Sequence, residues 1–161
     1  MKTRTSLLIV LILLTFTGLL SCQNGPDSFD LYLADTGEIL FSGEDVAVYH
    51  SGYGTLELKD AGIRKWNSYF NYESVPQSSR GLFNKEFILK IDGDEVCRGK
   101  IWSNLSSQSY SGVAILDGMI KLNNAYNSVW IRSSYPGNDP PGDKISSEIS
   151  RYFERHGKLA D

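Results

Sequence analysis

The chain has 161 residues, 22% of them charged, and a formal net charge of −3. This length suits one domain with a real core and is short for two. A modestly acidic chain without a basic patch has little affinity for nucleic acid or anionic lipid headgroups, so we expect no nucleic-acid partner.

The amino-terminal 22 residues have the pattern of an export signal. Lys2 and Arg4 precede an apolar run from Leu7 to Leu20. This run has about the length of a secretory h-region and is short for a membrane span. It ends in Leu19-Leu20-Ser21-Cys22, which resembles the lipobox of prokaryotic lipoproteins. We therefore predict a lipoprotein signal peptide over residues 1–21.

The resemblance to a lipobox implies that Cys22 begins the mature protein and carries diacylglycerol and palmitate. The domain would then be extracytoplasmic and lipid-anchored, at the outer membrane if the cell has two, since Gln23 rather than Asp follows. The alternatives are an ordinary cleaved signal peptide and a retained single-span anchor. The bulky Leu19 disfavours the first, and the lack of a basic cluster after residue 22 disfavours the second.

Cleavage before Cys22 would change both the charge and the cysteine count of the protein. Lys2 and Arg4 would leave with the signal, so the 16 basic residues would fall to 14 against 19 acidic ones, a net charge of about −5. Only Cys97 would remain with a free thiol. An internal disulfide would then be impossible, and a buried, unreactive Cys97 is the favoured interpretation.

The first half of the predicted mature chain contains a tether and several short elements. Residues 22–28 are the lipidated cysteine and a flexible tether, and a single α+β domain is expected over residues 29–161. The residues from Ser42 to Asp45 match a capping box and predict a short helical turn. Asp60 is expected to cap a helix over Ala61–Phe70. Strands are predicted over residues 29–33, 46–51 and 55–58.

A hairpin over residues 85–98 is the clearest local structure, because an Asp-Gly pair lies at its centre. An uninterrupted register would pair Leu89 with Val96 toward the core and turn Cys97 to the less apolar face. Gly99 is expected to form a bulge that re-aims the residues after it.

The second half of the chain adds strands and a final helix. Strands are expected over residues 113–116, 119–122 and 128–133. Asp143 is expected to cap a final amphipathic helix that stops at Gly157. The sum is an α+β fold: an antiparallel sheet of about six strands, with two main helices packed on one face.

The sequence shows no catalytic or metal-binding motif. His50 and His156 lie far apart, and neither belongs to an HExxH or a paired His/Cys spacing, so we expect no metal, no cofactor and no catalytic residue. The enzyme alternative is a small envelope hydrolase that uses His50 and a serine of the 103–111 loop.

The hydroxyl-rich segment Trp102–Gly112 is the best candidate for a binding surface, because long loops on rigid strands often carry function. Its aromatic residues would be exposed anchors. The alternative is a solvated connection without a ligand. The predicted contacts are Trp102, Ser106, Ser107, Tyr110 and Tyr53.

Three motifs within residues 38–100 carry a resemblance to a known family: Glu38–Val46, Leu56–Trp66 and Lys85–Val96. They are similar to the soluble extracytoplasmic head of the SecD protein-export subunit. The mature chain also resembles a group of small uncharacterised prokaryotic lipoproteins with a Ser-rich segment like Leu105–Gly112. The resemblance implies the fold and a capacity to touch polypeptide. SecD's role in the export motor does not carry over, because SecD has several transmembrane helices.

We therefore expect a non-enzymatic, lipid-anchored domain on the extracytoplasmic side that binds another envelope protein or an extended peptide. An exposed sheet edge would be one place to hold such a peptide. The alternatives are the hydrolase above and a purely structural surface lipoprotein.

Overall fold

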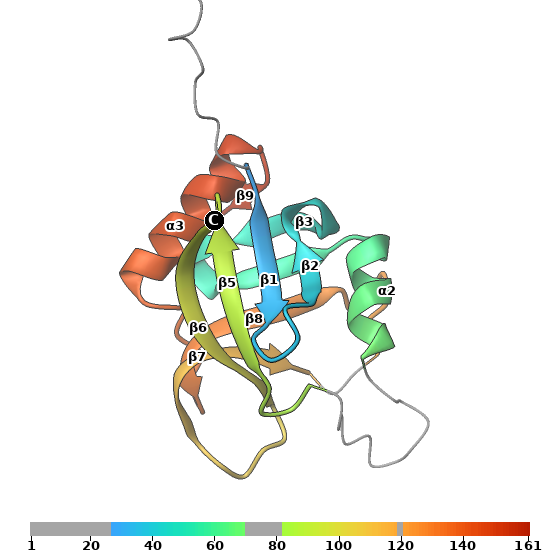
Figure 1. The fold of residues 1–161 in the computed structure, drawn as a ribbon, viewed down its shortest axis with the longest axis vertical. Helices are drawn as coiled ribbons and strands as arrows, with labels where there is room; N and C mark the ends of the chain where they lie inside the picture. Colours follow the sequence, from blue (N-terminus) through green and yellow to red (C-terminus); the bar gives the residue numbers. More distant parts are fainter. Residues whose placement is uncertain (1–26, 70–81, 119–120) are drawn as a thin grey trace, which may run out of the picture.

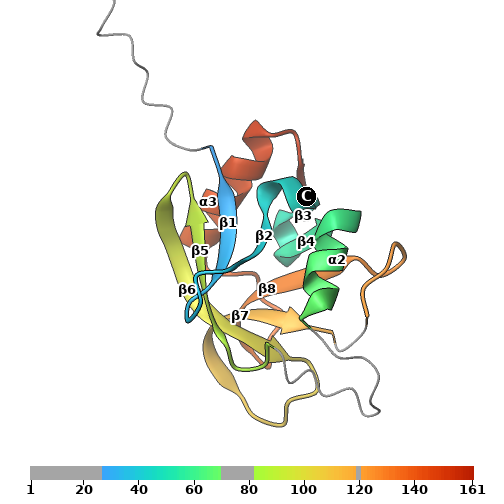
Figure 2. The ribbon, with the colours of Figure 1, turned by 45° about the vertical axis from the view of Figure 1, so that its right-hand side comes forward.

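A computed structural model of the chain describes residues 27–69, 82–118 and 121–161 (Figures 1 and 2). The predicted signal peptide, Cys22 and most of the tether lie outside these residues. The helices are α2 (Asp60–Ser68) and α3 (Asp143–Arg155), with two 3₁₀ turns, η1 (Gly43–Asp45) and η2 (Ser51–Tyr53). The strands are β1 (Phe29–Leu33), β2 (Ile39–Ser42), β3 (Val46–His50), β4 (Thr55–Leu58), β5 (Glu86–Ile91), β6 (Asp94–Ser103), β7 (Tyr110–Asp117), β8 (Ser128–Tyr135) and β9 (Leu159–Ala160).

The α+β class is confirmed, but the expected sheet was too small and wrongly all-antiparallel. The nine described strands form one sheet in the order β2-β1-β5-β6-β7-β8-β4-β3-β9. It is mixed, because β6 pairs with β7 and β3 with β9 in parallel. Strands β2 and β9 are only four and two residues long, too short to produce a clear period-two pattern. The sheet is strongly curved, so β7 and β8 run across the lower ends of β5 and β6 (Figure 2).

Both helices pack against one main core, which lies on the inner side of the curved sheet. Helix α2 neighbours β2 and β4, and α3 neighbours β3, β5, β6 and β9. In Figure 1 the two helices lie on opposite sides of the molecule. Their buried residues are Gly62, Ile63, Trp66, Ile149, Tyr152 and Phe153. Each helix therefore contributes one apolar stripe and leaves the rest of its surface polar.

The hairpin of β5 and β6 has the predicted turn and a different register. Lys90 pairs with Glu95 as expected, but Leu89 pairs with Cys97 because Val96 is an extra residue in β6. One extra residue turns every later side chain to the opposite face. The prediction that Cys97 faces outward was therefore wrong. Cys97 is buried, and burial, followed by the nearby Glu95 charge, raises its pKa to about 12, so the thiol is protonated and unreactive.

Gly99 has a different role from the predicted bulge, which lies instead at Val96. A Cβ atom at position 99 would lie 2.0 Å from the Val113 carbonyl oxygen and 2.7 Å from the Phe87 ring. Gly99 is therefore required by close packing, at the place where β6 and β7 approach each other.

The predicted capping box is confirmed at η1. The Ser42 backbone N–H donates to Asp45 Oδ2 at 2.9 Å, and the Ser42 hydroxyl donates to the same oxygen at 3.2 Å. Lys65 of α2 adds an ion pair to Asp45 at 2.6 Å. Asp60, in contrast, does not cap α2, because it is the first residue of that helix. Its negative charge there interacts favourably with the helix dipole.

Asn67 interrupts the apolar stripe of α2 for a structural reason. Its side-chain amide donates to the Leu122 carbonyl at 2.9 Å, and its Oδ1 accepts from the Leu122 N–H at 3.0 Å. Residues 121 and 122 were predicted as part of a strand but are not in one, and Leu122 is held by the Asn67 side chain instead. The rest of that predicted strand, residues 119–120, lies outside the described residues. Asp143 likewise does not cap the final helix as predicted: Gly142 is at the N-cap and Asp143 is the first helical residue. Gly157 follows the helix in the left-handed region at φ +65°, as expected of its stop.

Candidate binding face

A second apolar cluster lies on the side of β6, β7 and β8 that faces away from the main core. Ile101, Ile115 and Ile131 belong to the main core, so the residues next to them in sequence point to the other side of the sheet. Neither helix contributes a residue to this second cluster. We call it the aromatic face; it consists of Trp102, Tyr110, Ala114, Leu116, Trp130 and Tyr135.

Strand register aligns the aromatic face in a row. Trp102 of β6 is opposite Leu116 of β7, and Leu116 is opposite Trp130 of β8. Strand β7 has a register shift between Ser111 and Ala114, and its Tyr110 ring stacks on Trp102 at 5.3 Å and 22°. The ring of Phe83 contacts Trp102 from another side at 5.0 Å.

Trp102 lies inside the face rather than on its surface. Only 6% of this residue is exposed, and its indole N–H donates to the Gln108 carbonyl at 3.3 Å. The expectation of an exposed Trp102 beside the loop was therefore wrong: its large ring is covered by its neighbours and by the loop. Trp102 packs against Tyr110, which is half-buried. Burial, followed by the Glu86 charge, raises the pKa of Tyr110.

The loop between β6 and β7 is held against the aromatic face by Tyr135. The Tyr135 hydroxyl lies 2.8 Å from the Asn104 carbonyl and 3.1 Å from the Ser106 carbonyl. The Ser106 hydroxyl accepts from the Gln108 N–H within the loop, whereas Ser107 is exposed. At the tip, Leu105 is 75% exposed. Three predicted contacts, Ser106, Trp102 and Tyr110, are thus brought together.

Arg132 links the fourth predicted contact, Tyr53, to the face. The Arg132 guanidinium donates to the Tyr53 carbonyl through Nη1, and the Tyr53 residue itself is 68% exposed. Arg132 is opposite Ala114 in the register and only 8% exposed. Burial lowers its pKa, against a smaller opposing effect from Tyr49. The sequence signal was a single arginine directly after the apolar run Val129–Ile131 of β8.

A small apolar pocket continues the face at the start of β8. It has a volume of about 140 Å³, and Tyr126 at its rim is 64% exposed. Its lining residues are Gly118, Leu122, Ala125, Tyr126, Ser128 and Trp130. Since Trp130 belongs to both the pocket and the aromatic face, the two form one continuous surface.

The structure does not bring His50 to a serine of the 103–111 loop. His50 Nε2 lies 2.8 Å from Glu57 Oε1 on the neighbouring strand. Among the residues that the structure describes, no hydrogen bond joins this imidazole to a serine of that loop. The geometry therefore offers no support for the nucleophile and base that a hydrolase would need.

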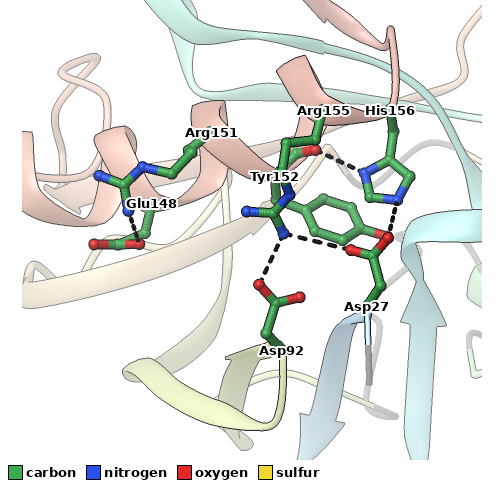
Figure 3. A network of polar contacts seen from close by, with 7 residues as sticks. All are labelled: Asp27, Asp92, Glu148, Arg151, Tyr152, Arg155 and His156. Carbon is green, nitrogen blue, oxygen red and sulfur yellow. Dashed lines mark hydrogen bonds and ion pairs between the residues drawn. The ribbon is translucent and has the colours of Figure 1, made fainter. Parts of the chain in front are cut away.

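A polar network ties the start of the domain to the end of α3 (Figure 3). Asp27 contacts Arg155 Nη2 at 3.4 Å and His156 Nε2 at 3.1 Å, and Arg155 also binds Asp92 at 2.8 Å. The Tyr152 ring stacks on the imidazole at 4.2 Å. Exposed ion pairs of this kind stabilise little individually. Together they fix the point at which the predicted tether joins the domain.

Comparison with protein-family models, with curated proteins and with solved structures found no match. The resemblance to the SecD head therefore stays a prediction. Within the described ranges, neither helix is long and apolar enough to cross a bilayer.

Proposed function

We propose that this chain is a lipid-anchored extracytoplasmic protein that binds an extended segment of another envelope protein through its aromatic face. It binds without catalysing a reaction. The observation that carries the proposal is the aromatic face itself, whose Tyr110, Trp130 and Tyr135 are half-buried. The exposed Tyr126 lines the adjoining pocket, and the backbone of the exposed Tyr53 is bound by Arg132. Trp, Tyr and Arg are the residue types that supply most of the binding energy at protein interfaces.

The dimensions of the face suit an extended peptide. Strand β8 runs along it for eight residues, which corresponds to about 26 Å at the usual rise of a strand. The apolar pocket lies near the start of this strand, and Arg132 with Tyr53 lies toward its end. Ser128 and Arg132 are four residues apart on β8, about 13 Å, so a segment of about four or five extended residues would reach from the pocket to Arg132.

The sheet edges are less suited to holding a peptide than the face. The described sheet ends in β2 on one side and in β9 on the other, and these strands have four and two residues. Short edge strands discourage pairing with another chain. For this reason we place binding on the face rather than at an edge.

The position of the loop between β6 and β7 is also consistent with a partner outside the membrane. In Figure 1 this loop lies at the end of the molecule opposite the start of β1, where the predicted tether joins. A short tether would hold the β1 end near the lipid. The loop and the adjoining part of the aromatic face would then point away from the bilayer.

Replacing both exposed tyrosines, Tyr53→Ala with Tyr126→Ala, should remove partners from the purified protein. Each hot-spot tyrosine is worth about 2 kcal/mol, or roughly 30-fold in affinity. The measurement is co-purification from detergent-solubilised membranes. The matched control is Ile39→Ala, which alters an exposed apolar side chain on β2, far along the sheet. An unchanged set of partners in the double variant would contradict this choice of surface.

Lipidation predicts a sharp difference between the two cysteines. Cys22→Ala should abolish palmitate labelling and release the protein into the soluble fraction, because two acyl chains are needed for stable anchoring. Cys97→Ala should leave labelling unchanged, since that thiol is buried in the core. Persistent labelling of Cys22→Ala would show that the anchor assignment is wrong.

A further inference from the structure

Arg132 is a buried cation without an acidic partner in the part of the chain that the structure describes. The residue is only 8% exposed, and its guanidinium bonds are to two backbone carbonyls, those of Tyr53 and Ile131. Its Nε–H has no hydrogen-bond partner among residues 27–69, 82–118 and 121–161. No carboxylate of the described residues forms an ion pair with it, whereas Arg98, Arg151 and Arg155 all have one.

Such an arrangement costs free energy in the isolated protein. Buried charges in folded proteins are normally paired, and carbonyl oxygens offset only part of the lost hydration of a guanidinium. A planar guanidinium has five N–H donors, and it binds a carboxylate through two parallel hydrogen bonds. Arg132 therefore has unused capacity of the kind that an incoming carboxylate would fill.

A second cation lies in the same cross-strand row. Lys100 of β6 is opposite Ala114 of β7, which is opposite Arg132 of β8. The Lys100 ammonium donates to Asn84 Oδ1 at 3.0 Å and lies 5.8 Å from the Tyr110 ring centre. It also forms no ion pair with a carboxylate of the described residues.

Two carboxylates on the strands next to this row do not pair with either cation. Glu57 is bound to His50. Glu86 is opposite Lys100 in the register of β5 and β6, but forms no salt bridge with it. Lys100 and Arg132 are therefore available to an acidic ligand, whereas Glu86, whose charge acts on Tyr110, would repel one.

We infer that the segment bound on the aromatic face carries an acidic side chain that pairs with Arg132, next to an aromatic or aliphatic side chain that packs on Trp130. This inference rests on the proposed function and specifies the chemistry of the partner. The purely structural alternative is that Arg132 only fastens the Tyr53 carbonyl to β8. In that case the partner's charge would not matter.

A peptide selection tests the inference directly. The full-length lipoprotein, held in lipid nanodiscs, is used to select from a random peptide display library, with empty nanodiscs as the counter-selection. We expect Asp or Glu next to an apolar residue in the selected sequences. Changing that acid to its amide in the best synthetic peptide should weaken binding at least about tenfold, as loss of a partly buried charge pair does.

Protein variants then locate the partner of the acidic side chain. Arg132→Gln should lower the affinity for the acidic peptide to that for the amide peptide. Arg151→Gln is the matched control, because that guanidinium is exposed and paired with Glu148 on α3. If Arg132→Gln does not fold, the comparison of acidic and amide peptides on the unaltered protein still tests whether binding requires an acidic side chain.

The outcomes separate the inference from the function on which it rests. Peptides that bind in a Tyr126-dependent way but show no preference for acidic residues would overturn the pairing with Arg132 and leave the binding face intact. If Arg132→Gln weakens binding of the acidic peptide and of the amide peptide equally, the pairing with Arg132 is likewise overturned and the binding face remains. Failure to select any peptide whose binding depends on Tyr53 or Tyr126 would overturn both.

Discussion

Gly99→Ala is expected to destabilise the protein by about 3 kcal/mol, although it adds a single methyl group. The new Cβ would lie 2.0 Å from the Val113 carbonyl oxygen. That oxygen belongs to the backbone and cannot rotate away. Strands β6 and β7 would have to separate beside the first residues of their parallel pairing, where Lys100 is opposite Ala114. Denaturant unfolding of the purified protein measures the loss.

Gly52→Ala is the matched control for this substitution. A Cβ at position 52 meets nothing within 4 Å, so the change in stability should stay within about 0.5 kcal/mol. Equal stability of the two variants would mean that β6 and β7 do not approach each other as described. The row that builds the aromatic face would then be wrong as well.

Asp45→Ala is expected to have the second-largest effect, a loss of about 2–3 kcal/mol at neutral pH. The Asp45 residue is 5% exposed; it accepts from the Ser42 N–H and pairs with Lys65. Its removal would leave the half-buried Ser42 N–H without its carboxylate partner and would break the ion pair between η1 and Lys65 of α2. Asp35→Ala, which breaks the exposed pair with Lys85, should change stability little.

The contribution of Asp45 should disappear in acid. Burial raises the pKa of this carboxyl, but the bonds from Lys65 and Ser42 outweigh that effect and hold it below its ordinary value. A carboxyl whose pKa is lower in the folded state stabilises the protein above its unfolded pKa, and this stabilisation is lost as the pH falls through the folded pKa. The gap between wild type and Asp45→Ala should therefore narrow in unfolding measurements below about pH 4. A gap that stays constant in acid would exclude the ionic part of the explanation.

Local signals in the sequence predicted local structure well. The Asp-Gly turn of the β5–β6 hairpin, the capping box of Ser42 and Asp45, and the stop of α3 at Gly157 all occur as expected. Each depends on residues within a few positions of one another. Their chemistry acts before any distant part of the chain is in place.

Features that depend on distant partners could not be predicted in this way. The extra residue Val96 reverses the direction of Cys97, and nothing in the local alternation marks it. Strand β9 has two residues and exists only because it pairs with β3. The parallel pairing of β6 with β7 contradicts the expected hairpin order, since that expectation considered only neighbours in sequence.

The candidate site was predicted in part. The loop residues Ser106 and Tyr110 do lie together with Trp102, but as a covered cluster and not as exposed anchors. Trp130, Tyr126 and Arg132 were missed. Their joint position depends on how β8 aligns with β7 and β4.

Photo-crosslinking in living cells tests the central claim, that the aromatic face binds another polypeptide, most directly. The photoreactive amino acid p-benzoylphenylalanine would replace Tyr126 at the face in one strain and Ile39 on β2 in another; both positions are exposed. We predict a discrete protein adduct at position 126, and loss of that adduct when Tyr53→Ala is added. Position 39 should yield no such adduct. The same adducts at both positions, or an adduct at position 39 alone, would contradict the account.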